Sequence, residues 1–142
     1  MKIPAILTIA LALAAPVLAQ DDLGNLSDNP YAPDSSSGLA NQYNPNSVSN
    51  PYGTYGSPYS NKSATNPYAT DPPKLYDDQG NYHGKLSANQ FDPDSTSNQF
   101  GRYGSQFSPD SINNQFGAGS PYTPDSPNNQ FGHGMHIEGD EN

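Results

Sequence analysis

Residues 107–116 read Phe-Ser-Pro-Asp-Ser-Ile-Asn-Asn-Gln-Phe, and the same nine-residue spacing of aromatic residues occurs five times along the chain. In each copy Ser stands four residues after the first aromatic residue, Asn seven residues after it, and Pro or Gln eight residues after it. The aromatic residues that open and close the copies are Tyr43, Tyr52, Tyr59, Tyr68, Phe91, Phe100, Phe107, Phe116, Tyr122 and Phe131. A fixed spacing of this kind in a polar chain is typical of a structural repeat.

The residue types inside one copy predict two bends. Ser108 precedes a proline and is expected to be extended, and Pro109 presets the dihedral angle of a turn. Asp110 and Asn114 are residues whose side chains bond nearby backbone amides in turns. We therefore expect a compact, non-helical coil that sets the aromatic rings in a row. A flexible proline-rich chain with evenly spaced rings is the alternative.

A longer repeat contains these copies. Residues 40–69 align with residues 88–117 at a constant offset of 48, with 14 of 30 positions identical. Four further positions exchange Tyr for Phe, so the ring is kept while the hydroxyl is not. This favours rings that pack on one another over rings that contact sugars. Tyr55 and Tyr103 match in this alignment and are the rings we would test first for sugar contact.

The segment between the two blocks predicts a β-hairpin. Leu75-Tyr76 and Tyr82-His83 are short strand candidates, and the residues between them, with Gly80 among them, have the composition of a turn. An isolated hairpin is marginal in water and needs a surface to pack on.

Composition sets the fold class that we expect. After residue 19, Leu, Ile, Val and Phe number 13 of 123 residues, well below the roughly 20% under which a charged chain is expected to be disordered. There is no Cys for a disulfide. We expect a mostly irregular structure of turn-rich aromatic repeats with one short β-hairpin, a large disordered fraction, and little or no helix after the signal peptide.

Residues 1–19 predict a secretory signal peptide. Lys2 precedes an apolar stretch that Pro16 interrupts, and Ala19 ends a small-residue cleavage pattern. An uncleaved N-terminal anchor is the alternative. The further segments we expect are a flexible stretch at 20–42, a first repeat block at 43–70, a hairpin and linker at 71–87, a second block at 88–132, and an acidic tail at 133–142.

The sequence offers no catalytic, cofactor or metal site that we would assign. Asp92, Asp94 and Asn98 have spacings that resemble those of oxygen ligands, but the segment lacks the Gly and Glu of a calcium loop, so we interpret them as turn formers. His133 and His136 lie near Glu138, yet a third strong ligand is missing and we read them as exposed tail histidines. We expect no enzyme, because so small a core cannot preorganise an active site.

The stretch from Asn98 to Tyr122, with its Gln-Phe and Ser-Pro-Asp-Ser words, resembles small uncharacterised exported bacterial proteins. Those proteins carry Asn-Pro-Tyr-Gly and Ser-Pro-Tyr-Ser-Pro-Asp-Ser repeats after a Leu-Tyr-Asp…Gly-x-Tyr-x-Gly segment. The resemblance covers about residues 74–132, and this chain departs from it by using Gln-Phe where Pro-Tyr is common. The resemblance implies an exported bacterial protein, and it brings no activity, ligand or fold that can be carried over to this chain.

These observations predict an exported, non-enzymatic structural or interaction protein of the bacterial envelope. Its partner would be an unknown protein or an envelope polysaccharide. The alternative is a module that binds peptidoglycan or another polysaccharide through exposed aromatics, and a calcium-dependent envelope protein is third. With four basic and fourteen acidic residues after residue 19, we expect no binding of nucleic acid, and no stable membrane span after signal cleavage.

Overall fold

A small antiparallel sheet and long runs of turns make up the computed structural model, which describes residues 20–32, 35–36 and 42–140. The predicted signal peptide lies outside these residues. The strands are β1 (Gln20–Leu26), β2 (Lys74–Tyr76), β3 (Tyr82–Lys85) and β4 (Met135–Asp140). The described residues contain no α-helix, and none of their segments is a helix that could cross a membrane. The expected fold class is confirmed in these respects.

The predicted hairpin is present as strands β2 and β3. Tyr76 pairs with Tyr82, and the turn between them is closed by bonds from the Asp77 amide to the Asn81 carbonyl and from the Gly80 amide to the Asp77 carbonyl, both 3.0 Å. Gly80 has a φ of 81°, the left-handed conformation that glycine adopts without steric cost.

Two strands were not predicted. β1 lies within the segment expected to be flexible, and β4 occupies most of the segment expected to be an acidic tail. They pair with each other, Leu26 opposite Met135, and β4 also pairs with β2. β1 contains only two apolar residues, so its order comes from a partner more than 100 residues away, which no local pattern reveals.

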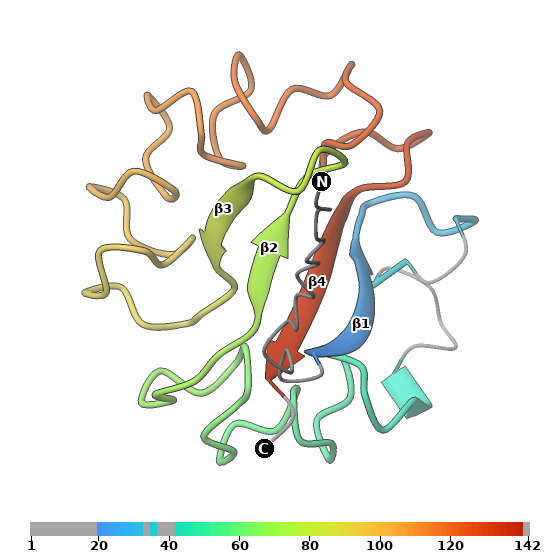
Figure 1. Cartoon of the computed structure of the whole chain (residues 1–142), viewed down its shortest axis with the longest axis vertical. Helices are drawn as coiled ribbons and strands as arrows, with labels where there is room; N and C mark the ends of the chain where they lie inside the picture. The colour runs from blue at the N-terminus through green and yellow to red at the C-terminus, as the bar shows by residue number, and fades with distance from the viewer. Residues whose placement is uncertain (1–19, 33–34, 37–41, 141–142) are drawn as a thin grey trace, which may run out of the picture.

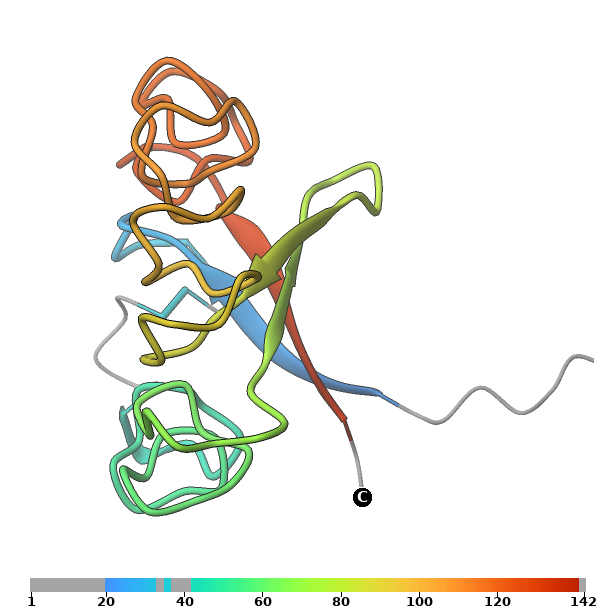
Figure 2. The same ribbon diagram turned by 90° about the vertical axis from the view of Figure 1, so that its left-hand side faces the viewer.

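The sheet has the order β1-β4-β2-β3, with β4 and β2 at the centre (Figure 1). Leu75 of β2 lies directly opposite Ile137 of β4, and both side chains are completely buried. With Met135, Leu23, Val48 and Tyr55 they form the core. Figure 2 shows that the turns gather on one side of the sheet and that the hairpin tip points to the other. Val48 and Tyr55 are core residues that the turns contribute.

The two halves of the chain have the same plan. Each begins with an edge strand, continues through turns and ends with a central strand, so the halves are related by an approximate twofold axis between β4 and β2. Each edge strand forms a parallel bridge to a serine in the turns that follow it, Asn25 with Ser35 and Lys85 with Ser95. The second bridge lies 60 residues after the first in the sequence. The two halves of the sheet are therefore equivalent at an offset of 60 residues, whereas the sequence repeat has an offset of 48.

We call the two runs of turns the first turn array (residues 27–32, 35–36 and 42–71) and the second turn array (residues 87–132). They surround the sheet in Figure 1. The start of the first array contacts the end of the second, where the Asp28 amide donates to the Pro127 carbonyl at 2.8 Å and Asn29 Nδ2 to the Gly132 carbonyl at 2.9 Å.

Candidate functional site: the exposed aromatic rings

The ten aromatic residues of the repeats lie on the surface. Their exposed fractions run from 79% at Tyr43 to 96% at Phe100, and Tyr31, which opens a degenerate copy, is 91% exposed. The expectation that these rings pack on one another was therefore wrong. The serine of every copy is buried instead, and the five serines are at most 4% exposed: Ser47, Ser63, Ser95, Ser111 and Ser126.

A three-residue period explains why serine is inside and the rings are outside. In the second array Ser105, Ser108, Ser111 and Asn114 each accept, through a side-chain oxygen, the amide two residues further on. The backbone amide three residues further on donates to the carbonyl of each, at 3.0–3.4 Å. Consecutive tight turns of this kind form a narrow coil, and only a small side chain that bonds the backbone fits its inner wall.

The asparagine that stands seven residues after the first ring fixes the backbone of the residue that carries the second ring of every copy. In the third copy, Asn98 Nδ2 donates to the Asp92 carbonyl at 3.1 Å and its Oδ1 accepts the Phe100 amide at 3.0 Å. The same two bonds recur at Asn50, Asn66, Asn114 and Asn129. The backbone beneath the exposed rings is therefore fixed, so the surface is organised before any ligand arrives.

Neighbouring coils are joined by a second set of amides. Asn113 Nδ2 reaches back to the Thr96 and Gly104 carbonyls, both at 2.9 Å. Asn128 Nδ2 reaches the Ile112 carbonyl at 3.0 Å and the Gly119 carbonyl at 2.9 Å. The coils of the second array are thus stacked, and their rings follow one another along its outside.

Grooves lie between consecutive rings of the second array. One of about 360 Å³ separates Phe107 from Phe116, and one of about 500 Å³ separates Tyr122 from Phe131. Phe107 also borders a third groove, with Phe100 on its other side. Their remaining lining is mostly amides, Gln106, Asn113, Asn114 and Gln115 in the first and Asn128, Asn129 and Gln130 in the second. These volumes fall in the range of small-molecule sites.

The residue before each exposed ring depends on the ring. Tyr follows Pro at Tyr31, Tyr52, Tyr59, Tyr68 and Tyr122. Phe follows Gln at Phe91, Phe100, Phe107, Phe116 and Phe131, and only Tyr43 follows Gln. Where a ring lacks a hydroxyl, the preceding residue thus supplies an amide. A polar group that donates and accepts hydrogen bonds therefore accompanies every ring, which a ring used only for packing does not need.

Tyr55 and Tyr103, the rings singled out in the sequence for sugar contact, are both buried. A methyl group built on Gly139 would lie 2.5 Å from the Tyr55 ring, and one on Gly84 would lie 2.6 Å from Tyr103 Cβ. Both tyrosines therefore pack against glycines of the sheet and belong to the core side of the turns.

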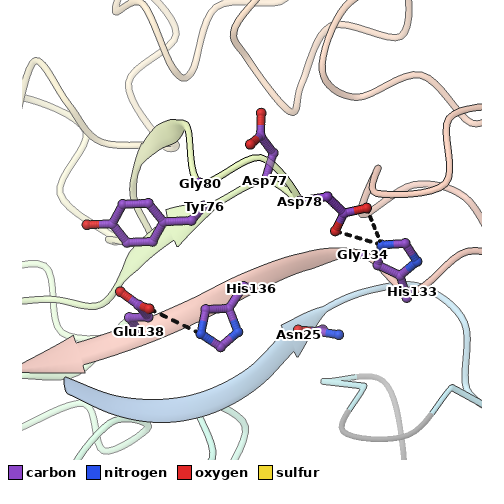
Figure 3. A pocket seen from close by; sticks show the side chains of 9 residues that line it. All are labelled: Asn25, Tyr76, Asp77, Asp78, Gly80, His133, Gly134, His136 and Glu138. Atoms are coloured by element: carbon purple, nitrogen blue, oxygen red, sulfur yellow. Dashed lines mark hydrogen bonds and ion pairs between the residues drawn. The ribbon is translucent and has the colours of Figure 1, made fainter. Parts of the chain in front are cut away.

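A polar cleft of about 610 Å³ lies beside the hairpin turn and the start of β4. Figure 3 shows His133 facing Asp78 and His136 beside Glu138. The distance from His133 Nε2 to Asp78 Oδ2 is 2.8 Å, and that from His136 Nε2 to Glu138 Oε1 is 3.3 Å. Each histidine thus has a carboxylate beside it. His133 is exposed, as expected, whereas His136 is half-buried in the central strand β4. Among the residues described, no group of three or more His, Asp or Glu side chains is arranged to hold a metal ion.

Asp92, considered above with Asp94 as a calcium ligand, has other partners. Asp92 accepts the Asp94 amide and the Lys85 ammonium, at 2.9 and 3.0 Å. Burial raises the pKa of Asp92, but these two bonds more than offset it and hold the pKa below the usual 3.8. The carboxylate therefore acts as a turn former with a cation beside it.

Comparisons of the chain with protein-family models, curated proteins and solved structures found no match. Its function is therefore inferred from its own residues.

Proposed function

We propose that this protein is an exported, non-enzymatic interaction protein of the bacterial envelope, and that its exposed aromatic rings bind polysaccharide. The single observation that supports this most is the exposure of all ten repeat rings on a hydrogen-bonded backbone. An exposed apolar surface of this regularity marks a binding surface in a soluble protein.

The chemistry beside the rings favours a sugar over an apolar partner. A pyranose ring presents C–H groups on its faces and hydroxyls on its edge, so it needs a flat apolar surface next to hydrogen-bonding groups. The groove between Phe107 and Phe116 provides two rings and the amides of Gln106, Asn113 and Gln115. The acidic net charge of the chain disfavours polyanions, which leaves uncharged polysaccharide as the favoured ligand.

Export is supported by the signal-like residues 1–19. Cleavage after Ala19 would remove no residue of strands β1 to β4.

Phe107 is the sharpest position for a test, because it borders two grooves. We expect Phe107→Leu to weaken retention of the protein on amorphous cellulose or insoluble peptidoglycan. An aromatic contact contributes about 0.5–1.5 kcal/mol beyond its buried area, which corresponds to about a two- to twelvefold weaker affinity.

Two controls separate ring stacking from general stickiness. Phe107→Tyr keeps the ring and should bind like the wild type, whereas Leu keeps apolar area but no ring. Retention should also persist at high salt, because the contact is not ionic. Equal binding by the Leu and Tyr variants would contradict stacking, and no retention of the wild type on either matrix would remove the proposal.

A further inference from the structure

Two grooves of the second turn array have the same construction. Asn113 lines the groove between Phe107 and Phe116, and it also lines the groove on the other side of Phe107. At the matching position of the next copy, Asn128 lines the groove that ends at Phe131. Both asparagines are exposed, so each is within reach of a ligand that lies between the rings.

The orientation of these two side-chain amides is determined by their partners. The Nδ2 atoms of Asn113 and Asn128 each donate to two backbone carbonyls. A carbonyl only accepts hydrogen bonds, so the nitrogen must face the coil and the amide cannot turn over without losing both bonds. No residue in the part of the chain that the structure describes donates to either Oδ1. Each asparagine therefore offers a ligand one acceptor of fixed orientation.

The other copies show that joining the coils does not require an amide at this position. Thr65 Oγ1 donates to the Gly56 carbonyl at 2.8 Å, and Asn113 Nδ2 donates to the Gly104 carbonyl at 2.9 Å, nine residues back in both cases. A hydroxyl that donates to a backbone carbonyl stands at this position in the first three copies, at Ser49, Thr65 and Ser97. The amide oxygen that only the last two copies carry is thus not needed to hold the coil.

We propose that Asn113 and Asn128 are specificity-determining residues of these grooves, and that each amide oxygen accepts a hydrogen bond from a hydroxyl of the polysaccharide. This inference rests on the proposed function, since it names what the same grooves select. A sugar whose hydroxyls are blocked offers no donor to these oxygens. The anchored amides should contribute more than the exposed Gln115, which must lose side-chain freedom before it can bond a ligand.

The test measures binding isotherms of the protein on amorphous cellulose and on the same cellulose after methylation of its hydroxyls. The wild type should bind the methylated form about fivefold more weakly, or weaker still, since fivefold is the effect of one net hydrogen bond. Asn113→Thr and Asn128→Thr keep a hydroxyl for the coil, as at Thr65, and each should weaken binding to unmodified cellulose by about fivefold. On methylated cellulose neither variant should differ from the wild type, because the contact is already absent. Gln115→Ala is the matched control and should weaken binding less than Asn113→Thr.

The outcomes separate this inference from the proposed function. If the wild type binds both forms of cellulose equally, or the Thr variants bind unmodified cellulose like the wild type, the inference is overturned and the proposed function stands. A loss of equal size on both forms also overturns it, because a loosened coil rather than a lost contact would then explain the change. A loss for Gln115→Ala as large as that for Asn113→Thr contradicts the role of the anchored oxygen. Retention on insoluble peptidoglycan but not on cellulose overturns the inference, since sugar hydroxyls would not suffice, and retention on neither matrix overturns both proposals.

Discussion

Replacing Asn114 by alanine tests whether the side-chain amides hold the turn arrays together. The Asn114 side chain is buried within the second array. Its Nδ2 donates to the Ser108 carbonyl at 3.0 Å and its Oδ1 accepts the Phe116 amide at 2.9 Å. Alanine removes both bonds without touching the apolar core.

The expected loss follows from those two bonds. Each bond contributes about 1 kcal/mol net. The Ser108 carbonyl keeps its bond from the Ser111 amide in the variant, whereas the Phe116 amide loses the side-chain oxygen that accepts it. We expect the free energy of unfolding to fall by about 2 kcal/mol, which is a shift of roughly 1 M in the urea midpoint for a slope of about 2 kcal/mol per M.

Urea unfolding followed by the near-ultraviolet circular dichroism of the tyrosines measures this shift. Gln115→Ala is the matched control, because Gln115 is the exposed neighbour on the same coil and surface changes usually stay within about 0.5 kcal/mol. Equal midpoints for the two variants would refute the view that the asparagine clamps stabilise the coils.

Two further predictions concern the sheet and its hairpin. Gly84→Ala should destabilise more than Gly80→Ala in the same urea assay: both have positive φ, at 95° and 81°, but a Cβ at 84 would lie 2.6 Å from the Asp94 carbonyl while one at 80 meets nothing within 4 Å. Equal losses would show that backbone conformation alone sets the cost. For Asp77, burial raises the pKa, but hydrogen bonds from Asn81 and His83 outweigh it and leave the pKa below 3.8. The stability that these bonds contribute is present above pH 3.8 and lost as the pH falls below it, so Asp77→Asn should flatten the fall in unfolding free energy between about pH 4 and pH 2. An unchanged pH profile would contradict this assignment.

The hairpin, the absence of α-helix from the residues that the structure describes and the bends within each copy were predictable, because they depend on short-range chemistry. Pro109 restricts its own backbone, Asn114 accepts the Phe116 amide through its side chain, and Gly80 adopts the positive φ that its turn requires. Strands β1 and β4 were not predictable, because each depends on a partner at the other end of the chain.

The position of the rings was predicted wrongly for an identifiable reason. The exchange of Tyr for Phe at matched positions suggests, by itself, a ring that needs no polar group. The residue before the ring shows otherwise, since Gln accompanies Phe where Pro accompanies Tyr, as at Phe100 and Tyr52. The three-residue spacing of Ser105, Ser108 and Ser111 was also visible in the sequence, and it would have placed serine on the inside.

The pairing of the first strand with the last has a consequence for how the chain acquires its structure. Leu26 cannot meet Met135 until nearly the whole polypeptide is available, and contacts at such separation are slow to form. The central strand β4 is also the last to be made, so no truncated product can complete the sheet. If the chain is exported while it is being synthesised, the sheet would stay open until β4 had followed the rest of the strands across the membrane.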